Sequence, residues 1–303
     1  MVEMGITLPL NGVTPLELRD GIYFKRDDLL KFNNGVSGKV RTSIWLADKA
    51  KELGADTLVY GGSVLAPALG RVASAAAYAG LKSQILIGSD PEKATAKHPT
   101  VRVASEAGAE LIRTPVAYNP YLQKKAREIA DLSQGSVFQV PYGVSTAPEW
   151  PVEWLQSFLD CDILQAEDLV KTGVTDLVVP FGSANAASGV LWSLDALGYG
   201  NLKTIHLMGI GPDKTEWFWA RLASAGLSRE EVEARVAVNW IPLHPFFAEY
   251  SDRMKETFLG IDFHPIYEGK MIRYLNQVEP EFWTRRDGTT CFWIVGSDLD
   301  AEA

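Results

Sequence analysis

Short apolar runs, each closed by a glycine or a proline, alternate with stretches of helical pattern along this chain. Residues 56–60 form one such run before Gly61, and an alanine-rich helical stretch, 70–79, follows. The run at 175–180 is so continuously apolar that we expect it to be buried on both faces. Strands that alternate with helices in this way build βαβ units and a parallel sheet. The pattern therefore predicts an α/β fold made of two lobes, each an open parallel sheet flanked by helices.

The same pattern can be followed to the end of the sequence. The expected strands are 56–60, 83–88, 109–113, 136–141, 175–180, 203–209 and 290–295. The expected helices are 70–79, 101–107, 121–133, 149–166, 190–197, 217–225 and 229–236. We find no internal repeat and no long linker between these elements.

Composition excludes several classes of protein. Among 303 residues, 29 Lys and Arg stand against 38 Asp and Glu, so the formal charge of -9 disfavours a nucleic-acid binder that depends on a basic surface. The two cysteines cannot build a disulfide framework, and the four scattered histidines predict no metal site. The N-terminus lacks the features of a signal peptide, and no stretch reaches the roughly 20 apolar residues of a membrane span. We expect a cytoplasmic protein.

Glycine-rich turns follow three of the predicted strands, at 61–70, 182–189 and 296–297. Ligands of open α/β sheets bind at such strand ends. The turn at 182–189 (Gly-Ser-Ala-Asn-Ala-Ala-Ser-Gly) follows a buried strand and opens a helix, so its backbone N–H groups suit a phosphate. It matches neither the P-loop nor the GxGxxG fingerprint. Alternatively, small residues at this turn only allow close packing.

A phosphate site without a nucleotide motif is typical of pyridoxal phosphate enzymes. The segment 24–29 (Phe-Lys-Arg-Asp-Asp-Leu), followed by 35–41 (Gly-Val-Ser-Gly-Lys-Val-Arg), resembles the opening of the 1-aminocyclopropane-1-carboxylate (ACC) deaminase and D-cysteine desulfhydrase family. These are pyridoxal-phosphate enzymes of the tryptophan-synthase-β-like class, fold type II. The resemblance continues, in the same order, at 61–62, 107–110, 141–145, 182–189, 265–270 and 292–297.

The resemblance implies pyridoxal 5'-phosphate as cofactor and a homodimer. It also implies a larger cofactor-binding domain, 1–45 plus 150–303, and a smaller α/β domain, 46–149. Lys39 matches the Schiff-base lysine, whose freed amine would abstract the α-proton of the substrate. A solvated surface lysine is the alternative interpretation. The residues that match the phosphate site are Gly182, Ser183, Ala184, Asn185, Ala186 and Gly189.

The other matched positions would surround the cofactor ring. Glu268 matches the carboxylate that lies close to the pyridine nitrogen, and Tyr267 matches an active-site tyrosine that acts as acid, base or hydrogen-bond donor. An ordinary turn of core and surface residues is the alternative here. Gly296 and Ser297 stand where the family has Gly-Gly, and they predict contacts to the ring edge.

One departure from the family concerns the substrate. The family carries Gln-Ser-Asn after its first glycine turn, where these residues hold the substrate carboxylate. This chain has a longer loop that places Pro67 and Ala68 at the serine and asparagine positions, so Ser63 could substitute only in a rearranged loop. We therefore keep Ser63 as a candidate catalytic residue and disfavour the standard ACC deaminase reaction.

Three functions stay open. The first is a pyridoxal-phosphate enzyme of amino acid metabolism, a lyase or deaminase that acts on a small amino acid or amine through an α-carbanion. The second is a lyase or decarboxylase whose amino-acid substrate is attached to a larger carrier, such as a modified nucleobase. The third is a non-catalytic relative that binds a phosphate-bearing ligand.

Overall fold

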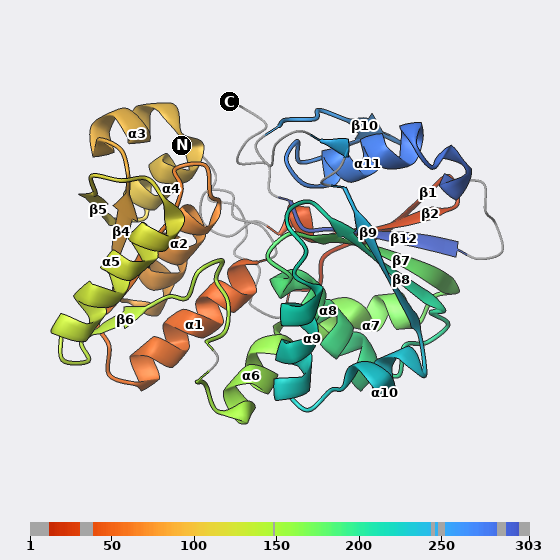
Figure 1. The fold of residues 1–303 in the computed structure, drawn as a ribbon, viewed down its shortest axis with the longest axis horizontal. Helices are drawn as coiled ribbons and strands as arrows, with labels where there is room; N and C mark the ends of the chain where they lie inside the picture. The colour runs from red at the N-terminus through yellow and green to blue at the C-terminus, as the bar shows by residue number, and fades with distance from the viewer. Residues whose placement is uncertain are drawn as a thin grey trace. The chain divides into compact units, whose positions relative to one another are not determined.

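The computed structural model describes residues 12–30, 39–147, 149–243, 246–247, 252–283 and 289–296, which form two compact units (Figure 1). Of the described residues, 39–147 and 149 belong to the first unit, and 12–30 together with those from 150 to 296 belong to the second. The described residues 39–45 group with the first unit, and the domain boundaries implied by the resemblance stay a prediction. These residues group there because the helix α1 (Val40–Glu52) packs against α2 (Ala68–Ala79).

The first unit is a parallel sheet with strand order β5-β4-β3-β6. Its strands are β3 (Thr57–Gly61), β4 (Lys82–Ile87), β5 (Glu110–Arg113) and β6 (Val137–Gln139), and its further helices are α3 (Pro91–Lys97), α4 (Pro99–Glu106) and α5 (Asn119–Leu132). The strand β3 is buried along its whole length, and α5 packs Leu122 and Ala126 against Val59 and Leu86. Helix α2 ends where Gly80 takes a left-handed conformation, as the sequence predicts.

The second unit contains a six-stranded sheet with the order β1-β2-β12-β7-β8-β9. The strands are β1 (Leu16–Arg19), β2 (Ile22–Arg26), β7 (Val174–Phe181), β8 (Thr204–Gly209), β9 (Ala237–Pro242) and β12 (Thr289–Ile294). Only β1 runs antiparallel to its neighbour in this sheet. Strands from the two ends of the chain meet here, because β2 pairs with β12 (Figure 1). A short hairpin, β10 (Thr257–Phe258) and β11 (Ile261–Asp262), pairs separately.

The helices of the second unit are α6 (Val152–Leu159), α7 (Ile163–Val170), α8 (Asn185–Ala196), α9 (Thr215–Ser224), α10 (Arg229–Glu233) and α11 (Glu268–Gln277). Helix α11 packs Met271, Ile272 and Leu275 into a core that Phe24 and Phe292 share on the sheet. The predicted α/β architecture of parallel sheets flanked by helices is confirmed. No helix of the described segments has the length and apolar character needed to cross a membrane.

Among the predicted helices, two differ most from those in the structure. The helix expected at 149–166 is two helices, because a 3-10 turn (Asp160–Asp162) separates α6 from α7. The helix expected from residue 190 begins at Asn185, so most of the predicted turn at 182–189 is helical.

Candidate active site

The carboxyl ends of β7 and β12 lie side by side in the second unit. The two strands pair in parallel, with Leu177 opposite Cys291 and Val178 opposite Phe292. Strand β7 leads into Gly182, and β12 leads into Val295 and Gly296. Ligand sites of parallel sheets form at such edges.

The turn after β7 is tight and strained. Ala184 has a φ of 62°, in the left-handed region, and is the N-cap residue of α8. For a residue with a side chain this conformation costs about 1–2 kcal/mol. Its carbonyl oxygen accepts from the backbone N and from Oγ of Ser188, both at 2.9 Å. The first N–H groups of α8 follow directly at Asn185 and Ala186, at a helix end that favours anions.

Gly189 lies in the second turn of α8 rather than in this turn. A Cβ added to Gly189 would lie 2.6 Å from Oδ2 of Asp162, so the missing side chain has a packing reason. Close packing thus accounts for this glycine, and its contribution to a phosphate site stays a prediction.

Tyr267 lies beside the turn after β7. A Cβ added to Gly182 would lie 3.9 Å from Cε1 of the Tyr267 ring. The ring of His264 lies 4.7 Å from that of Tyr267, between centroids, and the carbonyl oxygen of His264 accepts from the backbone N of Tyr267 at 3.2 Å. His264 was not among the predicted site residues, because a single histidine in a loop carries no signal that distinguishes it from a structural one.

Glu268 is the most informative residue of this edge. It is 2% exposed, and its Oε1 accepts from the backbone N of Val295 at 2.8 Å and from that of Gly296 at 2.7 Å. Its Oε2 is also buried, yet it has no hydrogen-bond partner among the described residues. A Cβ added to Gly296 would lie 2.5 Å from this Oε2, so only glycine admits the carboxylate here. Ser297, the other predicted ring contact, lies outside the described residues.

A buried arginine contacts the first residue of α8. Arg221, on α9, is 5% exposed and donates from Nη1 to Oδ1 of Asn185. Its guanidinium carbon lies 3.9 Å from the centroid of the Trp217 ring. Burial lowers the pKa of Arg221 to about 9, which leaves it protonated at neutral pH. No motif or local pattern points to this residue, because it comes from a separate helix.

The remaining predicted residues belong to the first unit. Lys39 is half-buried and is the N-cap residue of α1, where its carbonyl oxygen accepts from Oγ1 of Thr42 at 2.9 Å. The side chain of Ser63 accepts a hydrogen bond from the backbone N of Leu65 at 3.3 Å. Pro67 precedes α2 and provides no side-chain cap. The loop from Val64 to Ala68 thus carries only apolar side chains.

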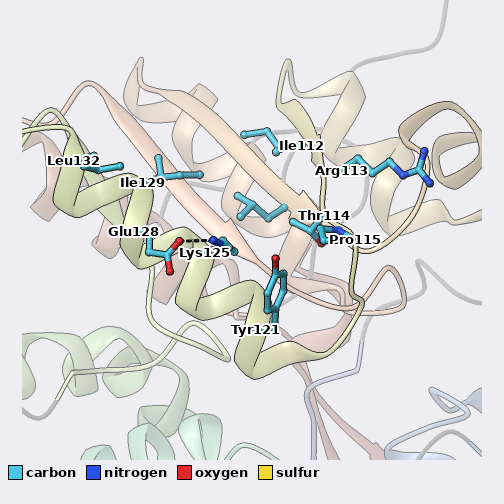
Figure 2. Close-up of a pocket in the computed structure, with 10 residues that line it drawn as sticks. Ile112, Arg113, Thr114, Pro115, Tyr121, Lys125, Glu128, Ile129 and Leu132 are labelled. Carbon is cyan, nitrogen blue, oxygen red and sulfur yellow. Dashed lines mark hydrogen bonds and ion pairs between the residues drawn. The ribbon is translucent and has the colours of Figure 1, made fainter.

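The first unit also has a separate pocket of about 280 Å³, beside β5 and α5 (Figure 2). Its lining is Leu86, Ile112, Arg113, Thr114, Pro115, Tyr121, Lys125, Glu128, Ile129 and Leu132. Lys125 and Glu128 form an ion pair of 2.6 Å at this pocket (Figure 2). None of the predicted site residues lines it.

The chain resembles proteins of known activity and structure, although no family model matches it. It is 24% identical to an O-seryl-dTMP PLP-dependent decarboxylase of Salmonella phage ViI, over 95% of this chain and 81% of that protein. Among solved structures, an ACC deaminase homologue has a TM-score of 0.72 at 19% identity, covering 96% of this chain and 90% of that chain. Apo diaminopropionate ammonia lyase of Escherichia coli has a TM-score of 0.60 at 15% identity, with 99% and 85% covered. Threonine deaminase isoform 2 of Solanum lycopersicum has a TM-score of 0.64 at 12% identity, with 97% and 82% covered. The chain therefore has the fold of the tryptophan-synthase-β-like, fold type II pyridoxal-phosphate enzymes, which its sequence predicts.

Proposed function

We propose that this protein is a pyridoxal-phosphate-dependent enzyme that breaks a bond to the α-carbon of an amino acid. The observation that carries the proposal is the buried Oε2 of Glu268, which has no partner among the described residues. A buried carboxylate oxygen without a partner costs free energy, so the site is built for a donor that a ligand supplies. The protonated nitrogen of a pyridine ring is such a donor.

The neighbouring residues fit the rest of the cofactor. The turn at Gly182, Ser183 and Ala184 leads into the N-terminus of α8, which suits a phosphate dianion. Asn185 and Ala186 provide the first residues of that helix. Gly296 has no side chain, and a Cβ there would lie 2.5 Å from Oε2 of Glu268, so the glycine lets the carboxylate keep its place at this edge. These residues share one sheet edge, and that supports the assignment.

Each protein group has its own task in the proposed reaction. When bound, pyridoxal phosphate supplies an electron sink for the charge that develops on the α-carbon. Glu268 would accept a hydrogen bond from the ring nitrogen through Oε2 and so favour a positive charge there. Lys39 would hold the cofactor, and its amine Nζ would carry the proton that is exchanged with the α-carbon, delivering it there where CO2 leaves. Tyr267 donates from its hydroxyl to the substrate beside the Gly182 turn.

Among reactions of this kind, we favour decarboxylation of an amino acid that is attached to a nucleotide. The phage relative carries out this type of reaction on O-seryl-dTMP, as its name states, and it aligns with 95% of this chain. The loop from Val64 to Ala68 supports the same choice, because its apolar side chains give a substrate carboxylate no donors. A carboxylate that is poorly solvated leaves more readily as CO2, with a proton taking its place on the α-carbon.

Deamination or elimination of a small free amino acid is the second candidate. The pair Tyr267 and Glu268, which resembles that of the deaminases, favours it, as does the TM-score of 0.72 with an ACC deaminase homologue. Ser63 would then have to hold the substrate carboxylate in place of the missing family residues.

Absorbance tests the cofactor and Lys39 together. The purified protein, supplied with pyridoxal phosphate, should show a band at roughly 410–430 nm that borohydride removes, as is general for lysine-bound cofactor. Lys39→Ala should abolish the band, whereas Lys49→Ala, on the same helix but paired with Glu52 at the surface, should retain it. A wild-type protein without the band would leave only the non-catalytic, ligand-binding function.

The products separate the two reactions. We expect CO2 and an amine from a seryl-thymidine nucleotide, offered both as mononucleotide and within an oligonucleotide. Ammonia release from free D- or L-amino acids, with no CO2 from either seryl nucleotide, would favour the deaminase function instead.

A further inference from the structure

Asn185 and Arg221 form a buried pair at the start of α8. Asn185 is 7% exposed and Arg221 is 5% exposed, and 36 positions of sequence separate them. Arginine has donors only, so the side-chain atom of Asn185 that faces it must be the acceptor Oδ1. The planar amide then directs its other group, the donor Nδ2, away from Arg221. A fixed amide at the first residue of a helix therefore adds a donor to those of the backbone.

A cation is costly at this place in the fold. Burial disfavours the charged form of Arg221, and its pKa is lowered to about 9 for that reason. The Trp217 ring, 3.9 Å from the guanidinium carbon, stabilises the cation in part. A phosphate dianion at the N-terminus of α8 would stabilise the cation further.

We propose that Arg221 is a positioning residue for the cofactor phosphate, which holds Asn185 so that Nδ2 donates to the phosphate while the guanidinium balances its charge. The inference deepens the proposed function and depends on it.

The first test is Asn185→Asp. The new carboxylate keeps the shape of the side chain and forms an ion pair with Arg221, so the apo protein should unfold at the same temperature as wild type or higher. It removes the donor and repels the phosphate, so the dissociation constant for pyridoxal phosphate should rise by about 10- to 100-fold. The affinity for pyridoxal, which lacks the phosphate, should change by less than about threefold. Fluorescence and absorbance titrations measure both ligands.

Arg221→Lys is the second variant, because lysine keeps the charge but not the forked geometry that holds the amide. This variant should also weaken the binding of pyridoxal phosphate more than the binding of pyridoxal. Arg229→Lys is the matched control, since Arg229 lies over Trp219 at 5.4 Å but pairs with Glu233 at the surface. It should leave both affinities unchanged.

The outcomes are distinct. If Asn185→Asp and Arg221→Lys bind pyridoxal phosphate as tightly as wild type, or lose both ligands equally, the pair is structural and the inference is wrong. If wild type itself binds no pyridoxal phosphate, the proposed function fails instead.

Discussion

At the scale of single residues, the two carboxylate oxygens of Glu268 have different roles, one in the fold and one in the proposed binding of the ligand. Its Oε1 holds the backbone after β12 through Val295 and Gly296, whereas its Oε2 serves nothing among the described residues. Glutamine can keep the first function, because its amide oxygen accepts the same two hydrogen bonds. Glutamine cannot replace Oε2 in the proposed contact with the ligand, because its side chain carries no charge.

We therefore expect Glu268→Gln to lower the turnover number by about 100-fold or more, the usual effect of losing one preorganised electrostatic contact. The free energy of unfolding of the apo protein should change by less than about 1 kcal/mol. Steady-state kinetics and denaturant unfolding measure the two quantities, with the exposed Glu216→Gln as control. A variant that unfolds readily but keeps its turnover would show that Glu268 has only a structural role.

The residues of the candidate site differ in how well the sequence predicts them. Gly182, Tyr267, Glu268 and Gly296 lie in short motifs at strand or helix ends, so local pattern and resemblance were enough to select them. Arg221 could not be selected, because only the packing of α9 beside α8 brings it to Asn185.

At the scale of elements, the packing of α5 on β3 depends on Gly61. A Cβ added to Gly61 would lie 2.6 Å from the backbone oxygen of Leu122, which cannot move without the helix. Gly61→Ala should therefore lower the free energy of unfolding by about 1–3 kcal/mol, the cost of overpacking a core. Gly173→Ala is the control, because a Cβ there meets nothing within 4 Å and should cost less than about 0.5 kcal/mol. Equal stability of both variants, in urea unfolding, would contradict this account of the α5 packing.

Elements with a strong periodic pattern were predicted, and elements held by distant pairing were not. The buried strands β3 and β7 and the alanine-rich helix α2 carry their signal within their own residues. By contrast, β1 and β2 carry several charged residues, and β2 is held in the sheet by β12 from the other end of the chain. The start of α8 was missed because small residues suit a turn and a helix equally well.

At the scale of the whole molecule, the overall charge limits how the proposed nucleotide-linked substrate would bind. The formal charge is -9, so long-range forces repel a polyanion, and recognition must depend on contacts with the amino-acid group. A protein that binds DNA by neutralising 6–10 phosphates loses about 10³–10⁵ in affinity between 50 and 200 mM salt.

For this protein we expect the opposite dependence on salt when the substrate is an oligonucleotide that carries the seryl base. The Michaelis constant should stay level or fall as salt rises over that range, because salt screens the repulsion between protein and substrate. The Michaelis constant for the mononucleotide, which has fewer charges, should change by less than about twofold and serves as the control. Kinetics at a series of salt concentrations measure both. A Michaelis constant that rises steeply with salt for the oligonucleotide alone would reveal a local basic surface that dominates over the net charge.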